Sequence, residues 1–291
     1  MKPPPFDYRA PDTLEEALDL LAQFGDDGKA LAGGQSLIPL LNFRLARPAV
    51  LIDLNKIAAL SGITPTSDGG LRIGAMTRQR TLERSEEIRA RAPLIRETLP
   101  HVAHPQIRNR GTIGGSLAHA EPAAELPAVM ITLGARLRLR SKEGGERWLT
   151  AEDFFTGLFS TALQTGELLT DVEIAHRPPR TGYAFDEMAR RHGDFALLGV
   201  AAQVTVDTSG TCREARITLV NPGAGAERMT RAAQLLVGQK PNATLAEQAG
   251  EVAAADVTAT GDVHASPEYR RQLARVMTRR VLERAFARAA Q

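Results

Sequence analysis

Two glycine pairs, Gly33-Gly34 and Gly114-Gly115, are the sequence feature that most restricts how this chain can fold. Glycine has no Cβ, so the backbone N–H groups of such a segment can turn toward one point. A concave set of amides of this kind is a ready anion site. Each segment also carries a hydroxyl that can donate to phosphate oxygens, Ser36 in the first and Ser116 in the second. Two such segments suit a diphosphate better than one does.

Taken alone, neither glycine segment identifies a ligand. A Gly-Gly pair is most often only a turn. Neither segment has the three spaced glycines of the dinucleotide-binding fingerprint, and neither continues as the Gly-Lys-Ser/Thr of a nucleotide-triphosphate loop. The residues by themselves therefore predict a phosphate-binding protein and no finer function.

Composition excludes several other classes of protein. The chain has 291 residues, which favours two domains, and its net charge of +2 with 4% aromatic residues does not suit nucleic acid. Cys212 is the only cysteine, so no internal disulfide can form and no iron–sulfur cluster can be held by this chain alone. No metal-ligand spacing, membrane-span run or signal-peptide segment is found. We expect a soluble cytoplasmic protein in which an organic cofactor carries any electrons.

The hydrophobic pattern predicts an α+β protein. Thr13 and Glu16 form a capping box that opens a helix, and Ser266 with Pro267 opens the last helix. Other helices are expected at 82–91, 93–102, 123–133, 229–237 and 245–255. Strands are expected at 50–54, 71–75, 135–139, 168–174, 183–189, 199–206 and 215–220. A boundary near 177–180 separates a longer part with both glycine pairs from a smaller part of sheet and helices.

Two long motifs sharpen this interpretation. The stretch 32–48 reads AGGQSLIPLLNFRLARP, and the stretch 110–129 reads RGTIGGSLAHAEPAAELPAV. Both resemble the FAD-binding segments of the medium subunit of aerobic carbon monoxide dehydrogenase and of related molybdenum hydroxylases. The short segments 6–8, 73–77 and 193–195 and the closing helix also fit, so the resemblance covers nearly the whole chain.

The resemblance implies a fold and a set of partners. Residues 1–177 would form the two-subdomain FAD-binding module of the vanillyl-alcohol-oxidase (PCMH) type, and residues 181–291 the small α+β C-terminal domain of the family, with FAD between them. The expected partners are a large subunit with a molybdenum cofactor and a small subunit with two [2Fe–2S] clusters, arranged as a dimer of heterotrimers. Electrons would pass from these clusters through FAD to an external acceptor. The substrate would bind on another subunit, which leaves carbon monoxide, purines, N-heterocycles and aldehydes open.

The resemblance also assigns residues to the cofactor. The two segments that would meet the FAD diphosphate contain Ala32, Gly33, Gly34, Gln35, Ser36, Thr112, Ile113, Gly114, Gly115 and Ser116. Glu125 matches an acidic position that contacts the ribityl hydroxyls, and Glu121 matches a nearby position that is often Asp. Phe195 matches an aromatic position, Tyr in some relatives, that covers one face of the isoalloxazine. No catalytic side chain and no metal ligand is expected.

Plainer interpretations exist for the same residues. Phe195 lies in an apolar run, where a phenylalanine is usually part of the core, and a pair such as Glu121 and Glu125 is usually solvated. The seven arginines of the last helix fit a surface helix or a subunit contact better than nucleic acid. A free-standing FAD-dependent reductase of the same fold and a flavin-free scaffold subunit are the alternatives to the electron-transfer subunit.

Overall fold

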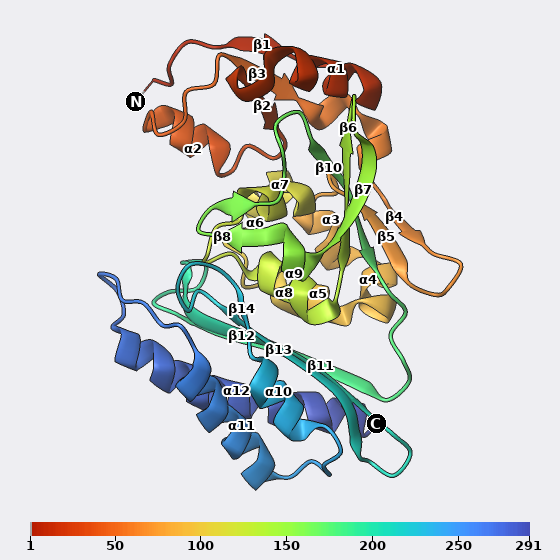
Figure 1. The fold of residues 1–291 in the computed structure, drawn as a ribbon, viewed down its shortest axis with the longest axis vertical. Helices are drawn as coiled ribbons and strands as arrows, with labels where there is room; N and C mark the ends of the chain where they lie inside the picture. Colours follow the sequence, from red (N-terminus) through yellow and green to blue (C-terminus); the bar gives the residue numbers. More distant parts are fainter. Residues whose placement is uncertain (1) are drawn as a thin grey trace.

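The structure is a computed structural model that describes residues 2–291. Its helices and strands form three units stacked along the long axis of the molecule (Figure 1). Each unit is built around its own sheet. The predicted α+β class is confirmed.

The N-terminal unit is a three-stranded parallel sheet of order β1-β3-β2. Its elements are β1 (Asp7–Arg9), α1 (Leu14–Phe24), η1 (Gly25–Asp27), β2 (Gly28–Leu31), α2 (Leu37–Asn42), β3 (Val50–Asp53), η2 (Leu54–Lys56) and η3 (Ala58–Leu60). The predicted capping box of α1 is present, because Glu16 N donates to Thr13 Oγ1 at 3.2 Å while the Glu16 carboxylate accepts from the Thr13 amide. Only Ala32 separates the end of β2 from the first glycine pair.

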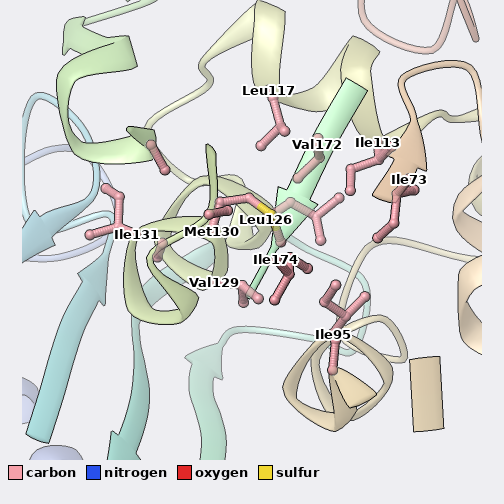
Figure 2. Close-up of a cluster of buried hydrophobic side chains, with 14 of the residues drawn as sticks. Ile73, Ile95, Ile113, Leu117, Leu126, Val129, Met130, Ile131, Val172 and Ile174 are labelled. Atoms are coloured by element: carbon pink, nitrogen blue, oxygen red, sulfur yellow. The ribbon is translucent and has the colours of Figure 1, made fainter. Parts of the chain in front are cut away.

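The middle unit is a five-stranded antiparallel sheet of order β4-β5-β10-β6-β7 covered by short helices. Its strands are β4 (Ile63–Pro65), β5 (Leu71–Gly74), β6 (Arg136–Ser141), β7 (Gly145–Thr150) and β10 (Leu168–Ile174), with a small hairpin of β8 (Phe155–Gly157) and β9 (Ser160–Thr161). Its helices are α3 (Gln79–Arg84), α4 (Glu86–Arg91), α5 (Pro93–Thr98), α6 (Pro105–Arg110), α7 (Ile113–His119), α8 (Glu125–Leu133) and α9 (Ala151–Phe154). Figure 2 shows Leu126, Val129 and Met130 of α8 packed beside Val172 and Ile174 of β10.

The C-terminal unit is a four-stranded antiparallel sheet of order β11-β12-β13-β14. Its elements are β11 (Thr181–Ala189), β12 (Ala196–Val206), β13 (Cys212–Val220), β14 (Glu227–Arg228), α10 (Thr230–Leu236), α11 (Ala243–Asp256) and α12 (Pro267–Ala289). The three helices cover one face of the sheet, and the middle unit covers the other (Figure 1).

Coverage on both faces explains the long apolar run of β12. Ala201 packs into the core of the middle unit, whereas its neighbours Val200 and Ala202 pack into the core beneath the helices. A strand that is buried on both faces has no solvent side and reads as a continuous hydrophobic run rather than an alternating one. The predicted strand 199–206 accordingly starts earlier, at Ala196.

Polar bonds join the middle and C-terminal units. Thr132 of α8 and Thr218 of β13 pair through their hydroxyls at 2.9 Å inside the junction. Glu97 of α5 accepts from the amide of Phe185 at 3.2 Å, and its other oxygen accepts from Arg288 of α12 at 2.5 Å. Buried polar groups that are paired in this way fix one arrangement of the two units.

Helix α12 uses its arginines within the chain. Arg270 is buried and pairs with Asp262, and Arg284 lies 3.2 Å from Asp186. Arg284 also donates to the Phe185 carbonyl at 2.8 Å, and Arg288 donates to the Tyr183 carbonyl. The helix packs on β11 and β12, so intramolecular pairing accounts for much of its basic character.

The predicted helix at 82–91 is wrong in one respect, because two helices occupy that stretch. Helix α3 ends at Arg84 and α4 starts at Glu86. Ser85 between them has the extended ψ of 130°, and its hydroxyl accepts from the Ile88 amide at 3.3 Å. A serine that caps the next helix competes with continuation of the preceding one.

Gly250 allows α11 and α12 to touch, which gives a test of the C-terminal packing. A Cβ on Gly250 would lie 2.4 Å from the Arg275 carbonyl. Gly250→Ala should therefore lower the free energy of unfolding by about 1–3 kcal/mol, although alanine favours a helix by about 1 kcal/mol over glycine. The measurement is urea unfolding. Gly225→Ala, where a Cβ meets nothing within 4 Å, is the control and should leave stability unchanged or slightly raised.

Candidate functional site

The first glycine segment follows β2 and leads into α2. Within the described residues, the backbone amides of Gly33, Gly34, Gln35 and Ser36 donate no hydrogen bond. Gly34 has a positive φ of 74°, which turns the chain here, and the Gln35 side chain donates to the Gly33 carbonyl at 3.0 Å. A run of free amides around a left-handed residue is an anion-binding arrangement, as predicted for this segment.

The second glycine segment is not the predicted loop but the first turn of α7. Thr112 caps this helix, and its hydroxyl accepts from the Gly115 amide at 3.0 Å. The Ile113 amide donates to Thr77 at 3.1 Å and the Gly114 amide to Ala75 at 2.8 Å. The expectation that these amides point free toward a diphosphate is therefore wrong, because the protein itself already uses them.

The glycines of both segments allow stretches of backbone to approach each other closely. A Cβ on Gly33 would lie 2.4 Å from the Arg110 carbonyl oxygen, and one on Gly114 would lie 2.5 Å from Ala75 Cβ. A Cβ on Gly115 would meet Ala32 Cβ at 3.3 Å. Neither Gly33 nor Gly115 has a positive φ, so backbone conformation does not explain the choice of glycine there. Gly33 and Gly115 lack side chains because the two segments touch along a seam, and Gly114 lacks one because it packs against Ala75.

Side chains that the sequence did not single out hold this seam. Asn55 donates through Nδ2 to the Ala32 carbonyl at 3.0 Å. Arg78 donates to the Arg110 carbonyl and to Asn55 Oδ1. The only signal in the sequence is that Arg78 directly follows the 73–77 segment.

The charges at the seam favour an anion. Burial lowers the pKa of Arg78, and the nearby positive charge of Arg110 lowers it further. Burial opposes ionisation of Asp53, but hydrogen bonds from Tyr8 and Asn55 outweigh it and hold the pKa of Asp53 below its usual value. Two guanidinium groups thus lie near one carboxylate that is already hydrogen-bonded, and the excess positive charge suits a phosphate.

The two glutamates that follow α7 lie in different surroundings from those of a solvated pair. Ala120 ends the helix in the left-handed conformation, Glu121 is half-buried, and Glu125 is buried at the first position of α8. Burial, together with the charge of Glu187, raises the pKa of Glu125 to about 8. Burial also raises the pKa of Glu121. The solvated interpretation is wrong for Glu125, which is largely protonated at neutral pH.

Phe195 is 67% exposed, so the core interpretation is wrong for this residue. It lies just before β12, in the β11–β12 connection, where Gly193 has a φ of 86° and closely approaches the His104 ring. His104 precedes α6, the helix that leads into the second glycine segment.

Asn221 connects Phe195 to the acidic loop. Its side chain donates to the Ala196 carbonyl at 2.5 Å, and its backbone amide donates to the Pro122 carbonyl at 3.1 Å. Its own φ of 55° is left-handed, a conformation that asparagine tolerates better than most residues. The structure thereby ties the residue after Phe195 to the loop that carries Glu121 and leads to Glu125 at the start of α8, although these residues lie far apart in the sequence.

No group of three or more His, Cys, Asp or Glu side chains suited to a metal ion is found among residues 2–291. None of the helices in that range is both long enough and apolar enough to cross a membrane. Cys212 is buried, and burial raises the pKa of its thiol to about 11.

Comparisons with known proteins agree with this arrangement. Residues 4–176 match the family described as the FAD binding domain in molybdopterin dehydrogenase, and residues 183–285 match the CO dehydrogenase flavoprotein C-terminal domain. The chain is 44% identical to the alpha subunit of the 6-hydroxypseudooxynicotine dehydrogenase complex of Paenarthrobacter nicotinovorans, over 99% of this chain and 97% of that one. It is 40% identical to the carbon monoxide dehydrogenase medium chain of Afipia carboxidovorans, over 99% of each. The crystal structure of quinoline 2-oxidoreductase from Pseudomonas putida 86 superposes with a TM-score of 0.94 at 40% identity, over the full length of both chains.

The raised pKa of Glu125 predicts a pH dependence of stability. The folded state holds this proton above the usual glutamate pKa, so the free energy of unfolding should fall as pH rises from about 4.5 to about 8. Glu125→Gln removes the titration and should flatten this decline, which is at most about 1.4 kcal/mol per pH unit. Urea unfolding of FAD-free protein at pH 5 and pH 8.5 measures it, with the exposed Glu143→Gln as control. Equal pH dependence in wild type and Glu125→Gln would contradict the assignment.

Proposed function

The chain belongs to the family of FAD-binding subunits of molybdenum hydroxylases, which includes carbon monoxide dehydrogenase medium chains, and on this premise we propose its place in an electron path. Its cofactor is FAD, and it is one subunit of an oxidoreductase. We infer that electrons reach it from [2Fe–2S] clusters on a small partner subunit and leave through FAD to an external acceptor. Substrate oxidation then takes place on a large partner subunit with the molybdenum cofactor.

The observation that carries the proposal is the run of unpaired amides at 33–36. Free backbone donors in the low-dielectric seam hold phosphate oxygens without a side chain. The exposed Ser36 hydroxyl adds a donor, and Arg78 and Arg110 supply positive charge. We infer that these donors and charges hold the diphosphate of FAD.

The second segment contributes in a different way from the first. Gly115 and Ser116 are partly exposed, whereas Thr112, Ile113 and Gly114 are buried. We propose that the Ser116 hydroxyl and the bare Gly115 backbone contact the cofactor directly. The three buried residues do not contact the cofactor. They support the site by fixing α7 against residues 75–77, which follow β5.

The flavin end of the cofactor is proposed to lie at the junction of the middle and C-terminal units. Protonated Glu125 can donate a hydrogen bond to a ribityl hydroxyl, which an ionised carboxylate cannot do. The exposed ring of Phe195 offers a flat apolar surface to one face of the isoalloxazine. Bound FAD supplies the redox chemistry, and this chain supplies orientation, electrostatics and solvent exclusion.

The domain division is proposed at 177–181. The segment between β10 and β11 lies outside any helix or strand. The sheets before and after it are separate, and the apolar side chains of helices α10–α12 pack into the core of the second. Residues 1–177 then form the FAD-binding module of two subdomains, and residues 181–291 form the C-terminal domain.

The proposed function is tested by a substitution that places a side chain between the two glycine segments. Gly33→Val puts a branched side chain where the Arg110 carbonyl lies, so the segments must separate and FAD should be lost on gel filtration. The measurement is flavin absorbance per chain, with circular dichroism to confirm folding. Gly225→Val, whose Cβ faces open space, should keep FAD. A folded wild-type chain that binds no added FAD would refute the proposal.

Exposed apolar side chains support a role inside a complex. Phe43 is 64% exposed and Leu45 is 76% exposed directly after α2, and Phe159 is 52% exposed at the β8–β9 turn. Single exposed apolar residues are ordinary, but several large ones close to cofactor segments are typical of binding surfaces. We propose that partner subunits cover these residues in a dimer of heterotrimers.

Co-purification tests the partner proposal. Phe43→Ser with Leu45→Ser should weaken recovery of the molybdenum and iron–sulfur subunits about tenfold or more, because apolar anchors dominate interface energy. FAD content per chain should stay unchanged. Val263→Ser, at a residue that is 93% exposed in the C-terminal unit, is the matched control. Unchanged metal content in complexes of the double variant would argue against this surface as an interface.

A further inference from the structure

We propose that Arg78 and Asn55 form a clamp that sets the separation of the two glycine segments, and with it the width of the diphosphate site. The inference rests on the FAD binding proposed above and adds two positioning residues to it. Neither residue belongs to a glycine segment. Both act through the backbone carbonyls of the segments that they hold.

Arg78 links the two sides of the seam through its forked head. One guanidinium nitrogen, Nη1, donates to the carbonyl of Arg110 at the entrance of the second segment. The other, Nη2, donates to Asn55 Oδ1, which belongs to the N-terminal unit. A planar guanidinium offers two divergent donors at a fixed spacing, whereas a lysine ammonium is a point charge.

Asn55 completes the link to the first segment. Its Nδ2 donates to the Ala32 carbonyl at 3.0 Å, the residue just before Gly33. Asp53 fixes the Asn55 amide in this orientation, because Asp53 Oδ1 accepts from both the backbone and the side-chain nitrogen of Asn55. Tyr8 in turn donates to Asp53 Oδ2. The Asn55 amide therefore has one stable placement, with its oxygen toward Arg78.

Arg78 holds the Arg110 carbonyl, which is also where the second glycine segment closely approaches the first. The same Arg110 oxygen lies 2.4 Å from the position of a Cβ on Gly33. Backbone bonds lock Arg78 to the second segment as well, since the Gln79 amide donates to Gly111 at 2.9 Å and the Ile113 amide to Thr77 at 3.1 Å. The clamp thus acts where a shift of a few tenths of an ångström would open or close the site.

A charged arginine at this position has an electrostatic cost that a neutral side chain would not have. Burial and the neighbouring Arg110 both disfavour the charged form of Arg78. The charge of Asp53 favours the charged form of half-buried Arg78, but no salt bridge to Arg78 is present within residues 2–291. A bound diphosphate would supply further negative charge. The Arg78–Asn55 pair should therefore matter most when the site is loaded.

The test measures FAD affinity of the full-length chain by quenching of flavin fluorescence, for Arg78→Lys, Asn55→Ala and the double variant. The clamp predicts that each single variant binds FAD about tenfold or more weakly, the scale of a lost hydrogen bond to a charged group. Because Arg78 reaches Ala32 only through Asn55, the two losses should be strongly non-additive. Arg72→Lys, which alters a surface ion pair with Glu173 at 3.0 Å, is the matched control and should bind as wild type does.

The outcomes separate the clamp from other roles. Wild-type affinity in Arg78→Lys would mean that Arg78 acts by charge alone, and wild-type affinity in Asn55→Ala would mean that the link to Ala32 is dispensable. Additive losses would mean two independent contacts. Each of these results overturns the clamp, while a wild-type chain that fails to bind FAD would overturn the proposed function instead. Circular dichroism of each FAD-free variant checks folding, and Asn55→Gln replaces Asn55→Ala if the latter does not fold.

Discussion

The structure depends on one contact between two backbones, in which the Arg110 carbonyl lies against Gly33 with no room for a side chain. This contact joins the N-terminal unit to the middle unit at the place where the chain leaves β2 and where it enters α7. Backbone groups can approach so closely only if the residue has no Cβ. The amides of 33–36 next to that contact donate no hydrogen bond, and Gly34 turns the chain there with a positive φ.

In the proposed site, each of the three units contributes different groups to one elongated cofactor. The N-terminal unit offers the unpaired amides of 33–36. The middle unit offers the buried carboxyl of Glu125 at the start of α8, and the C-terminal unit offers the exposed ring of Phe195 before β12. Asn221 joins the last two through the hydrogen bond from its amide to the Pro122 carbonyl, and Arg78 with Asn55 joins the first two. Chain segments far apart in sequence are thereby set at fixed positions, which is the protein's main contribution to flavin chemistry.

Local signals in the sequence predicted much of the fold. The capping box at Thr13, the strand 168–174 and the serine–proline start of the last helix are all present, since each depends on neighbours within a few residues. No helix was predicted at the second glycine pair, and each glycine disfavours a helix by about 1 kcal/mol. Tertiary contacts overrule that preference, because Thr112 caps the helix and Gly114 must fit against Ala75. The roles of Asn55, Arg78 and Asn221 arise only when three separate segments meet, so no pattern along the chain could reveal them.

The bonds from Glu97, Arg284 and Arg288 to the backbone of Phe185 and Tyr183 have a consequence for the chain before it finds its partners. Strand β11 borders its sheet, with β12 on one side only. Its outward carbonyls and amide are the groups that an invading strand from another molecule would need, and side chains already occupy them. A border strand shielded in this way cannot template addition of further strands. Strand β11 is therefore protected against edge-to-edge pairing between newly made chains.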